Sequence, residues 1–141
     1  MKRVRRRDTD AELLLRQALW RKGFRYRLHG PNLTGSPDIV LLRANTVIFV
    51  DGDFWHGRIL IEQGARELRR SFRGARSDYW VQRIKRNVAR DILQTRDLMD
   101  GGWNVVRVWE TTILRKTTET LGTIVKALSR NRRARSTFLR L

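Results

Sequence analysis

The sequence predicts an α/β fold in which a central mixed sheet lies between layers of helices. Two apolar runs rich in β-branched residues, 39–42 and 47–50, flank a turn and indicate two antiparallel strands. A third strong strand is expected at 103–109, between two amphipathic helices. The order helix, strands, helix, strand, helix is typical of a compact three-layer domain.

The composition limits both the size of the fold and the kind of partner. A chain of 141 residues with a hydrophobic fraction of 40% has room for one domain with a single core. Its formal charge of +17, from 31 basic and 14 acidic residues, indicates a polyanionic partner, and nucleic acid is the first candidate. No segment approaches the roughly 20 apolar residues of a spanning helix. We therefore expect no membrane partner.

The absence of cysteine restricts the metal chemistry that the chain can support. Without thiols there are no disulfides and no thiolate metal sites, so carboxylate and imidazole groups are the available ligands. Hard, oxygen-bound Mg²⁺ fits this set better than zinc.

The chain divides into a basic arm (1–7), a folded core (8–129) and a basic tail (130–141) of one domain. The first helix is expected to open at Thr9, which with Glu12 forms a capping box. A second amphipathic helix should run from Ser77 to the Gly101-Gly102 pair, and a last one over 117–128. The arginine-rich stretch 58–76 is interpreted as a partly ordered loop.

The hairpin carries two aspartates that suggest a metal site. If Ala44 and Asn45 form a two-residue loop, the register places Asp38 opposite Asp51. Directly opposed side chains lie roughly 5 Å apart at Cβ, where like charges repel unless a positive charge lies between them. A shared divalent cation would remove this repulsion.

A proline-aspartate pair at the start of one strand and a second acid on the next resemble the PD-(D/E)xK nuclease superfamily, which has a restriction-endonuclease-like fold. A closer resemblance is to the very-short-patch repair (Vsr) DNA mismatch endonucleases. Eight blocks in order over residues 7–110 support it. They are Arg7-Asp8-Thr9 with Glu12, Gly23–Arg27, Gly35–Asp38, Val47–Val50, Gly52 with Phe54–His56, Tyr79-Trp80 with Ile84, Asn87-Val88 with Arg90-Asp91, and Gly102-Trp103 through Val108–Glu110.

The resemblance implies catalytic roles for several residues. Asp38 matches the metal-binding aspartate, and Val50 stands where the family supplies a backbone carbonyl to the metal. His56 matches the histidine that activates water or positions the phosphate, and Glu12 matches a helix-borne glutamate near the water. Asp51 stands where the mismatch enzymes carry a histidine, and we expect it to be a second metal ligand.

The resemblance also implies the DNA contacts. Phe54, Trp55 and Trp80 match aromatic residues that the family inserts around the mismatched base pair. Core packing is the alternative explanation for these aromatic residues, and for Trp80 the two are balanced. Several arginines are expected to contact phosphates, and our candidates are Arg5, Arg6, Arg7, Arg58, Arg83 and Arg86.

The chain departs from the family at three points. Asp53 and Thr111 stand where the family's structural zinc site needs thiols, so we expect no structural zinc. Asp51 replaces a histidine. The superfamily's lysine has no clear counterpart, which leaves His56 as the candidate for proton transfer.

Asp38 and Glu12 also have purely structural explanations. Asp38 can be a turn residue, and Glu12 can be half of a capping box.

The resulting hypothesis is a Mg²⁺-dependent DNA endonuclease of the bacterial cytoplasm that nicks one strand at or near a mismatched, T:G-like, or distorted base pair in DNA repair. A restriction or defence nuclease of the same superfamily without mismatch preference is the first alternative. A DNA-binding module that has lost catalysis is the second, because of the missing lysine and zinc ligands.

Overall fold

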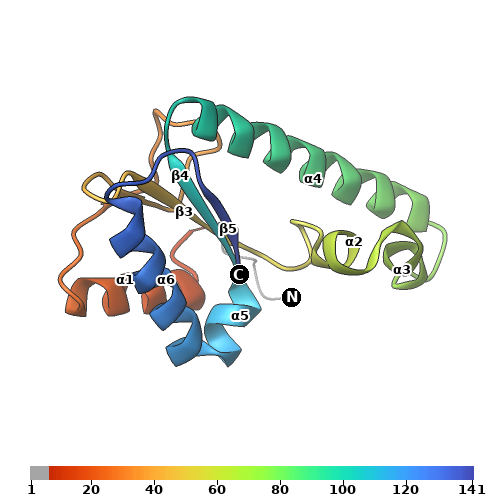
Figure 1. Ribbon diagram of the computed structural model, residues 1–141. Helices are drawn as coiled ribbons and strands as arrows, with labels where there is room; N and C mark the ends of the chain where they lie inside the picture. Colours follow the sequence, from red (N-terminus) through yellow and green to blue (C-terminus); the bar gives the residue numbers. More distant parts are fainter. Residues whose placement is uncertain (1–6) are drawn as a thin grey trace.

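The computed structural model describes residues 7–141 (Figure 1). The expected phosphate contacts Arg5 and Arg6 lie outside the described residues, whereas Arg7 is described and exposed. The elements in chain order are α1 (Asp10–Arg21), β1 (Arg27–Leu28), β2 (Ile39–Leu41), β3 (Thr46–Asp51), α2 (Arg58–Gln63), α3 (Ala65–Arg70), α4 (Ser77–Asp100), β4 (Asn104–Trp109), α5 (Glu110–Arg115), α6 (Thr117–Asn131) and β5 (Phe138–Arg140).

A five-stranded mixed sheet in the order β1-β2-β3-β4-β5 forms the middle layer. The pairs β1–β2 and β2–β3 are antiparallel, whereas β4 runs parallel to both β3 and β5. Parallel neighbours need a long crossover connection, which here contains α2, α3 and α4 between β3 and β4. The predicted α/β fold with a mixed sheet is confirmed.

The two faces of the sheet are covered by different helices. Figure 1 shows α4 along one face and α1, α5 and α6 on the other. Successive residues of a strand point to opposite faces, so Ile48 belongs to the core under α1, α5 and α6, while Val47 belongs to the core under α4. The larger core contains Ala11, Leu15, Leu19, Ile39, Leu41, Ala44, Ile48, Val106, Val108, Ile113, Ile124 and Leu128.

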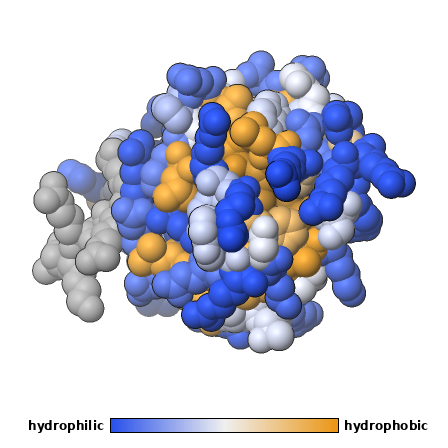
Figure 2. Space-filling view, turned by 90° about the vertical axis from the view of Figure 1, so that its left-hand side faces the viewer, coloured by the Kyte–Doolittle hydropathy of each residue, from blue (hydrophilic) through white to orange (hydrophobic). Residues whose placement is uncertain are grey.

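Most of the positive charge lies on the surface. On the face shown in Figure 2, hydrophilic side chains surround a central apolar area. Of the described basic residues, only Arg16 and Arg107 are buried. The molecule therefore presents its charge to solvent, as a polyanion-binding protein must. None of the helices within residues 7–141 combines the length and the apolarity that crossing a membrane requires.

The predicted start of α1 is correct, but Glu12 does more than cap it. Thr9 accepts a hydrogen bond from the Glu12 amide at 3.3 Å, as the capping box predicts. The Glu12 carboxylate accepts from the Asp8 amide at 2.9 Å, one residue earlier than a capping box would have it.

The predicted hairpin register is wrong. β2 pairs with β3 through Leu41 opposite Thr46 and Ile39 opposite Ile48, so the turn has four residues instead of two. Asn45 has a left-handed conformation with φ 49° and its amide donates to the Leu42 carbonyl. Continued along the strands, this register does not oppose Asp38 to Asp51, so the side-by-side pair of aspartates does not form.

The stretch interpreted as a partly ordered loop, 58–76, is helical over most of its length. It forms α2 and α3, separated by Gly64 with φ 94°. Leu68 is buried against Val81 and Ile84 of α4, and Ile59, Leu60, Phe72 and Val88 pack around them. The few apolar residues of this stretch therefore suffice to fix two short helices to α4.

The basic tail is also part of the folded domain. Its residues Phe138–Arg140 form β5, which pairs in parallel with β4 and adds an edge strand. Before it, the expected last helix extends to Asn131, and α5 was not foreseen. The boundary at residue 130 is therefore corrected, because the tail supplies main-chain hydrogen bonds to the sheet.

Replacing Ile48 by alanine should lower the free energy of unfolding by about 2–5 kcal/mol, because this side chain is fully buried between the sheet and α1. The matched control is Leu42→Ala at the hairpin turn, where the side chain is 56% exposed and a change within about 0.5 kcal/mol is expected. Urea denaturation measures both. Equal losses in the two variants would contradict the assigned core.

Candidate active site at the end of strand β3

Asp38 lies where the chain enters β2, and its carboxylate accepts a hydrogen bond from the Val50 amide at 2.7 Å. The pairing between β2 and β3 ends with Ile39 opposite Ile48, so it does not extend to Asp38 and Val50. The amide and the carbonyl of one strand residue face the same neighbouring strand. The Val50 carbonyl therefore shares with Asp38 an edge of β3 that β2 does not cover.

The protonation of Asp38 is strongly affected by its surroundings. Burial raises the pKa of Asp38 to about 7, although the Val50 amide lowers it, and the negative charges of Glu12 and Asp51 raise it further. No lysine or arginine among residues 7–141 forms an ion pair with Asp38. A buried carboxylate beside a carbonyl oxygen and near other acids fits a hard divalent cation.

Glu12 approaches this edge from α1 and is only 3% exposed. Its carboxylate also accepts from Arg16 at 3.2 Å. The same Arg16 nitrogen lies 2.8 Å from Asp8 and 3.4 Å from the His29 ring. Asp8, Glu12 and His29 have ligand atoms within 4.8 Å of one another, but the Arg16 guanidinium contacts all three. We therefore interpret this cluster as a binding site for the Arg16 guanidinium and not for a metal ion.

Asp51 lies at the buried end of β3, and its charge is balanced by two arginines. Both of its oxygens lie 3.0 Å from one Arg107 nitrogen, and one of them lies 2.8 Å from Arg140 of β5. The role predicted for Asp51 as a metal ligand stays a prediction. In this arrangement both of its oxygens are already occupied.

His56 follows β3 and is held by a carboxylate that the sequence prediction missed. Its Nδ1 lies 2.6 Å from Asp91 of α4 and 3.6 Å from Asp51. Burial alone would lower the pKa of His56, but the hydrogen bond to Asp91 and the charges of Asp51 and Asp91 outweigh it and raise the pKa above its ordinary value. Nδ1 is thereby engaged, which leaves Nε2 to serve a reactant.

The position of Asp91 on α4 contains the signal that could have revealed it. The buried stripe of this helix is Val81, Ile84, Asp91, Thr95 and Leu98. The neighbouring Ile92, although apolar, is exposed and does not belong to this stripe. A carboxylate at helical spacing within an apolar stripe must have a buried partner, because uncompensated burial of a charge is costly.

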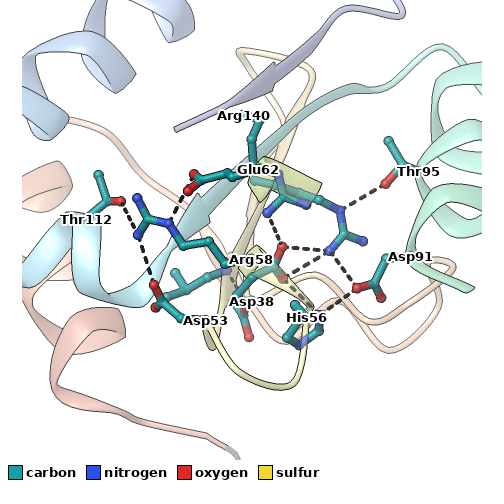
Figure 3. A network of polar contacts seen from close by, with 12 residues as sticks. Asp38, Asp53, His56, Arg58, Glu62, Asp91, Thr95, Thr112 and Arg140 are labelled. Carbon is teal, nitrogen blue, oxygen red and sulfur yellow. Dashed lines mark hydrogen bonds and ion pairs between the residues drawn. The ribbon is translucent and has the colours of Figure 1, made fainter. Parts of the chain in front are cut away.

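In Figure 3, Thr95, Asp91, His56 and Arg140 belong to one network of hydrogen bonds and ion pairs, which the contacts of Arg107 join together. The Arg107 guanidinium also donates to Thr95 at 2.9 Å, lies 3.9 Å from Asp91, and stacks 4.0 Å from the centre of the Phe49 ring. The network therefore joins β3, β4, β5, α4 and the loop of His56 (Figure 3).

The aromatic residues expected to enter DNA do lie together, beside His56. Trp55 packs edge-on against Phe54 at 4.9 Å and against Trp80 at 5.7 Å between ring centroids. Phe72 and Tyr79, which the sequence prediction did not include, extend this aromatic cluster. Phe54 is 49% exposed. We name the five residues Phe54, Trp55, Phe72, Tyr79 and Trp80 the aromatic cluster.

Asp53 and Thr111, which stand at the family's thiol positions, bind each other and Arg58. Arg58 donates to Asp53 and to Thr111 at 2.9 Å, and the Thr111 hydroxyl lies 2.5 Å from Asp53. The predicted phosphate contact Arg58 is thus used inside the protein, where it ties α2 to α5. Arg83 and Arg86 remain exposed on α4, and Arg83 lies 5.2 Å from the Trp55 ring.

Oxygen ligands on one strand edge, with an imidazole fixed by a carboxylate beside them, form the kind of site that a metal-dependent nuclease uses. Known proteins agree with this class. The family model described as DNA mismatch endonuclease Vsr matches residues 1–62.

Three relatives cover most of the chain. The type II nicking enzyme V.NmeDIP of Neisseria meningitidis serogroup C is 35% identical over 112 residues, which are 79% of this chain and 72% of the relative. V.XorIIP of Xanthomonas oryzae pv. oryzae is 40% identical, over 78% and 76%. DNA mismatch endonuclease Vsr of Escherichia coli K12 is 33% identical, over 78% and 66%. The chain belongs to the Vsr family and is a DNA endonuclease.

Asp38→Asn should stabilise the metal-free protein, and the gain should grow from pH 5 to pH 8. The pKa of Asp38 is about 7 in the folded state. Asp38 therefore stays protonated in the folded protein at pH values at which it is already ionised in the unfolded chain. Stability therefore falls as pH rises through this window. The upper limit of the gain is about 4 kcal/mol. Urea titrations at both pH values measure it.

The control for that experiment is Asp100→Asn at the exposed end of α4, which should change little at either pH. Adding a divalent cation should stabilise the wild-type protein and leave Asp38→Asn unchanged, since only the former offers the charged ligand. A variant less stable than wild type at pH 8 without cation would contradict this description of Asp38.

Proposed function

We propose that this protein is a Mg²⁺-dependent endonuclease that nicks one strand of duplex DNA at or beside a mismatched, T:G-like, or distorted base pair. The observation that supports this most is the placement of Asp38 and the Val50 carbonyl on one strand edge, with His56 and the aromatic cluster next to it. The curated relatives come from bacteria, so the proposed location is the bacterial cytoplasm.

Asp38 and the Val50 carbonyl would hold the cation. Mg²⁺ is preferred because both ligands are oxygens and the chain has no cysteine. When bound, the ion would polarise a phosphoryl oxygen and lower the pKa of a water. We place Asp51 in the arginine network instead of among the ligands, because Arg107 and Arg140 already engage both of its oxygens.

His56 and Glu12 would handle the proton and the water. His56 would accept the proton of the attacking water at Nε2 while Asp91 holds Nδ1 and stabilises the charged ring. Glu12, fixed by Arg16 and by the Asp8 amide, would orient the water beside Asp38. The lysine of the wider superfamily is then not needed for proton transfer.

The aromatic cluster would provide the preference for mismatches. Inserting Phe54 and Trp55 into the duplex separates stacked bases, which costs a few kcal/mol and least at a mispaired step. Phe54 and Trp55 directly precede His56 in the chain. Distortion of the DNA at these rings would therefore occur next to the phosphate that reacts. Arg83, Arg86 and Arg7 are exposed and would contact the DNA backbone.

We further propose that the protein holds no structural zinc. The hydrogen-bonded trio Asp53, Arg58 and Thr111 links the loop of the aromatic residues to α5. It can keep the loop in place by itself.

A restriction-type role without mismatch preference is the second candidate function. It is favoured by the relatives that are named type II nicking enzymes. Loss of catalysis is less consistent with the site. The proposed metal ligands, Asp38 and the Val50 carbonyl, and the proposed base, His56 held by Asp91, are all present.

A nicking assay on duplexes that carry each single mismatch tests the proposal. We expect Mg²⁺-dependent cleavage of one strand, fastest at a T:G pair and at least tenfold slower on the matched duplex. Asp38→Asn should abolish cleavage but keep affinity, and Asp100→Asn should behave as wild type. Equal cleavage of matched and mismatched duplexes would favour the restriction-type function, and cleavage without metal would exclude the mechanism.

His56→Ala should reduce the nicking rate by about 10²–10⁴, the usual contribution of a general base. In the wild type, the rate should rise with pH as His56 loses its proton at the raised pKa. Asp91→Asn removes the main group that raises this pKa, so the acid limb should move to lower pH and the maximal rate should fall. Single-turnover rates between pH 5 and 9 show both effects, and an unmoved acid limb would argue against His56 as the base.

A further inference from the structure

The segment from α3 to the start of α4 forms a strongly basic projection that the proposed mechanism does not use. We name residues 65–76 the arginine arm. Its single acidic residue is Glu67. Its arginines are Arg66, Arg69, Arg70, Arg73 and Arg76, and all five are exposed.

The arginine arm is held at a fixed place relative to the active site. Leu68 is 2% exposed and packs on Val81 and Ile84 of α4. Figure 1 shows α3 beside the first turns of α4, away from the sheet. The arginine arm therefore lies at the N-terminal end of α4, the helix that contacts His56 through Asp91, and it does not cover the sheet (Figure 1).

Part of the charge of the arm has no internal counterion. Arg69 pairs with Asp78, and Arg70 pairs with Glu67 at 3.2 Å. Arg66, Arg73 and Arg76 form no ion pair within the described part of the chain. Repulsion between unpaired arginines opposes folding, so a retained excess of this kind indicates an anionic ligand outside the protein.

The arm also joins the aromatic cluster. The Phe72 ring lies 5.9 Å from that of Phe54, between ring centroids, and Arg83 lies within 6.0 Å of the Trp80 ring centre. Guanidinium groups next to exposed aromatic rings are the combination that binds nucleic acid. An acidic protein would use the charge but would leave the rings without a partner.

The reach of the arm along DNA follows from the helix. From Asp91, which contacts His56, back to Ser77, α4 rises about 1.5 Å per residue and spans about 21 Å. At 3.4 Å per base pair this corresponds to roughly six base pairs. We propose that the arginine arm binds backbone phosphates of the duplex on one flank of the nick, about six base pairs away. This inference rests on the proposed function.

The test compares two triple variants in binding and cleavage. Arg66→Gln/Arg73→Gln/Arg76→Gln removes the unpaired arginines of the arm. Lys126→Gln/Arg130→Gln/Arg133→Gln removes the same charge at the end of α6, on the other side of the sheet. Affinity is measured by fluorescence anisotropy with a 30-base-pair mismatched duplex in Ca²⁺, over 50–300 mM NaCl.

The arm variant should bind about 100-fold more weakly at 0.1 M salt, and its slope of log affinity against log salt should be smaller by about 2–3. The control variant should stay close to wild type. Shortening the duplex to three base pairs on one side of the nick should weaken wild type to the level of the arm variant, and shortening the other side should not. Nicking at saturating DNA should be the same for all three proteins.

An unchanged salt slope in the arm variant, or an equal loss in the control variant, would overturn the proposal. Affinity is read without cleavage, so the arm is tested even if wild type fails to nick any duplex. In that event the proposed function fails and the binding result still decides the role of the arm.

Discussion

The buried ion pair between Arg107 and Asp51 is the interaction on which the geometry of the active site depends. One guanidinium joins Asp51 at the end of β3 to Thr95 and Asp91 of α4, and Asp91 in turn holds His56. Removing one partner of such a buried pair typically costs about 3–5 kcal/mol, because the other charge remains without compensation. The main effect of the pair is therefore to fix the position of α4 relative to the end of β3. Its net contribution to the stability of the fold is smaller.

This arrangement distributes the charges unequally among the acids at the strand end. Arg107 and Arg140 balance Asp51, His56 pairs with Asp91, and Arg16 holds Glu12. Asp38 has only the Val50 amide, and its pKa is raised to about 7 as a result of burial and of its acidic neighbours. A cation at Asp38, as proposed, would complete this pattern of charge compensation, and the second ring nitrogen of His56 would remain available to accept a proton.

The sequence predicted the elements of the sheet well because they depend on local pattern, and it predicted their pairing poorly because that depends on one turn. The β-branched runs predicted β2 and β3 correctly, but the turn between them is two residues longer than predicted, so Asp51 is not directly opposite Asp38. β5 has three residues in a basic tail and exists only through its pairing with β4. Motifs predict Asp38 and His56 as site residues, whereas Asp91, Arg107 and Arg140 join the network around them only through contacts distant in sequence.

The proposed mechanism depends on one structural claim, that Asp38 and the Val50 carbonyl form the metal site. A crystal structure of the protein with Mn²⁺ and a mismatched duplex tests it most directly, because the anomalous signal locates the ion without reference to activity. We predict one strong peak within about 2.0–2.3 Å of both oxygens. A peak in the Asp8, Glu12 and His29 cluster, or at Asp51 with Arg107 displaced, would contradict the claim.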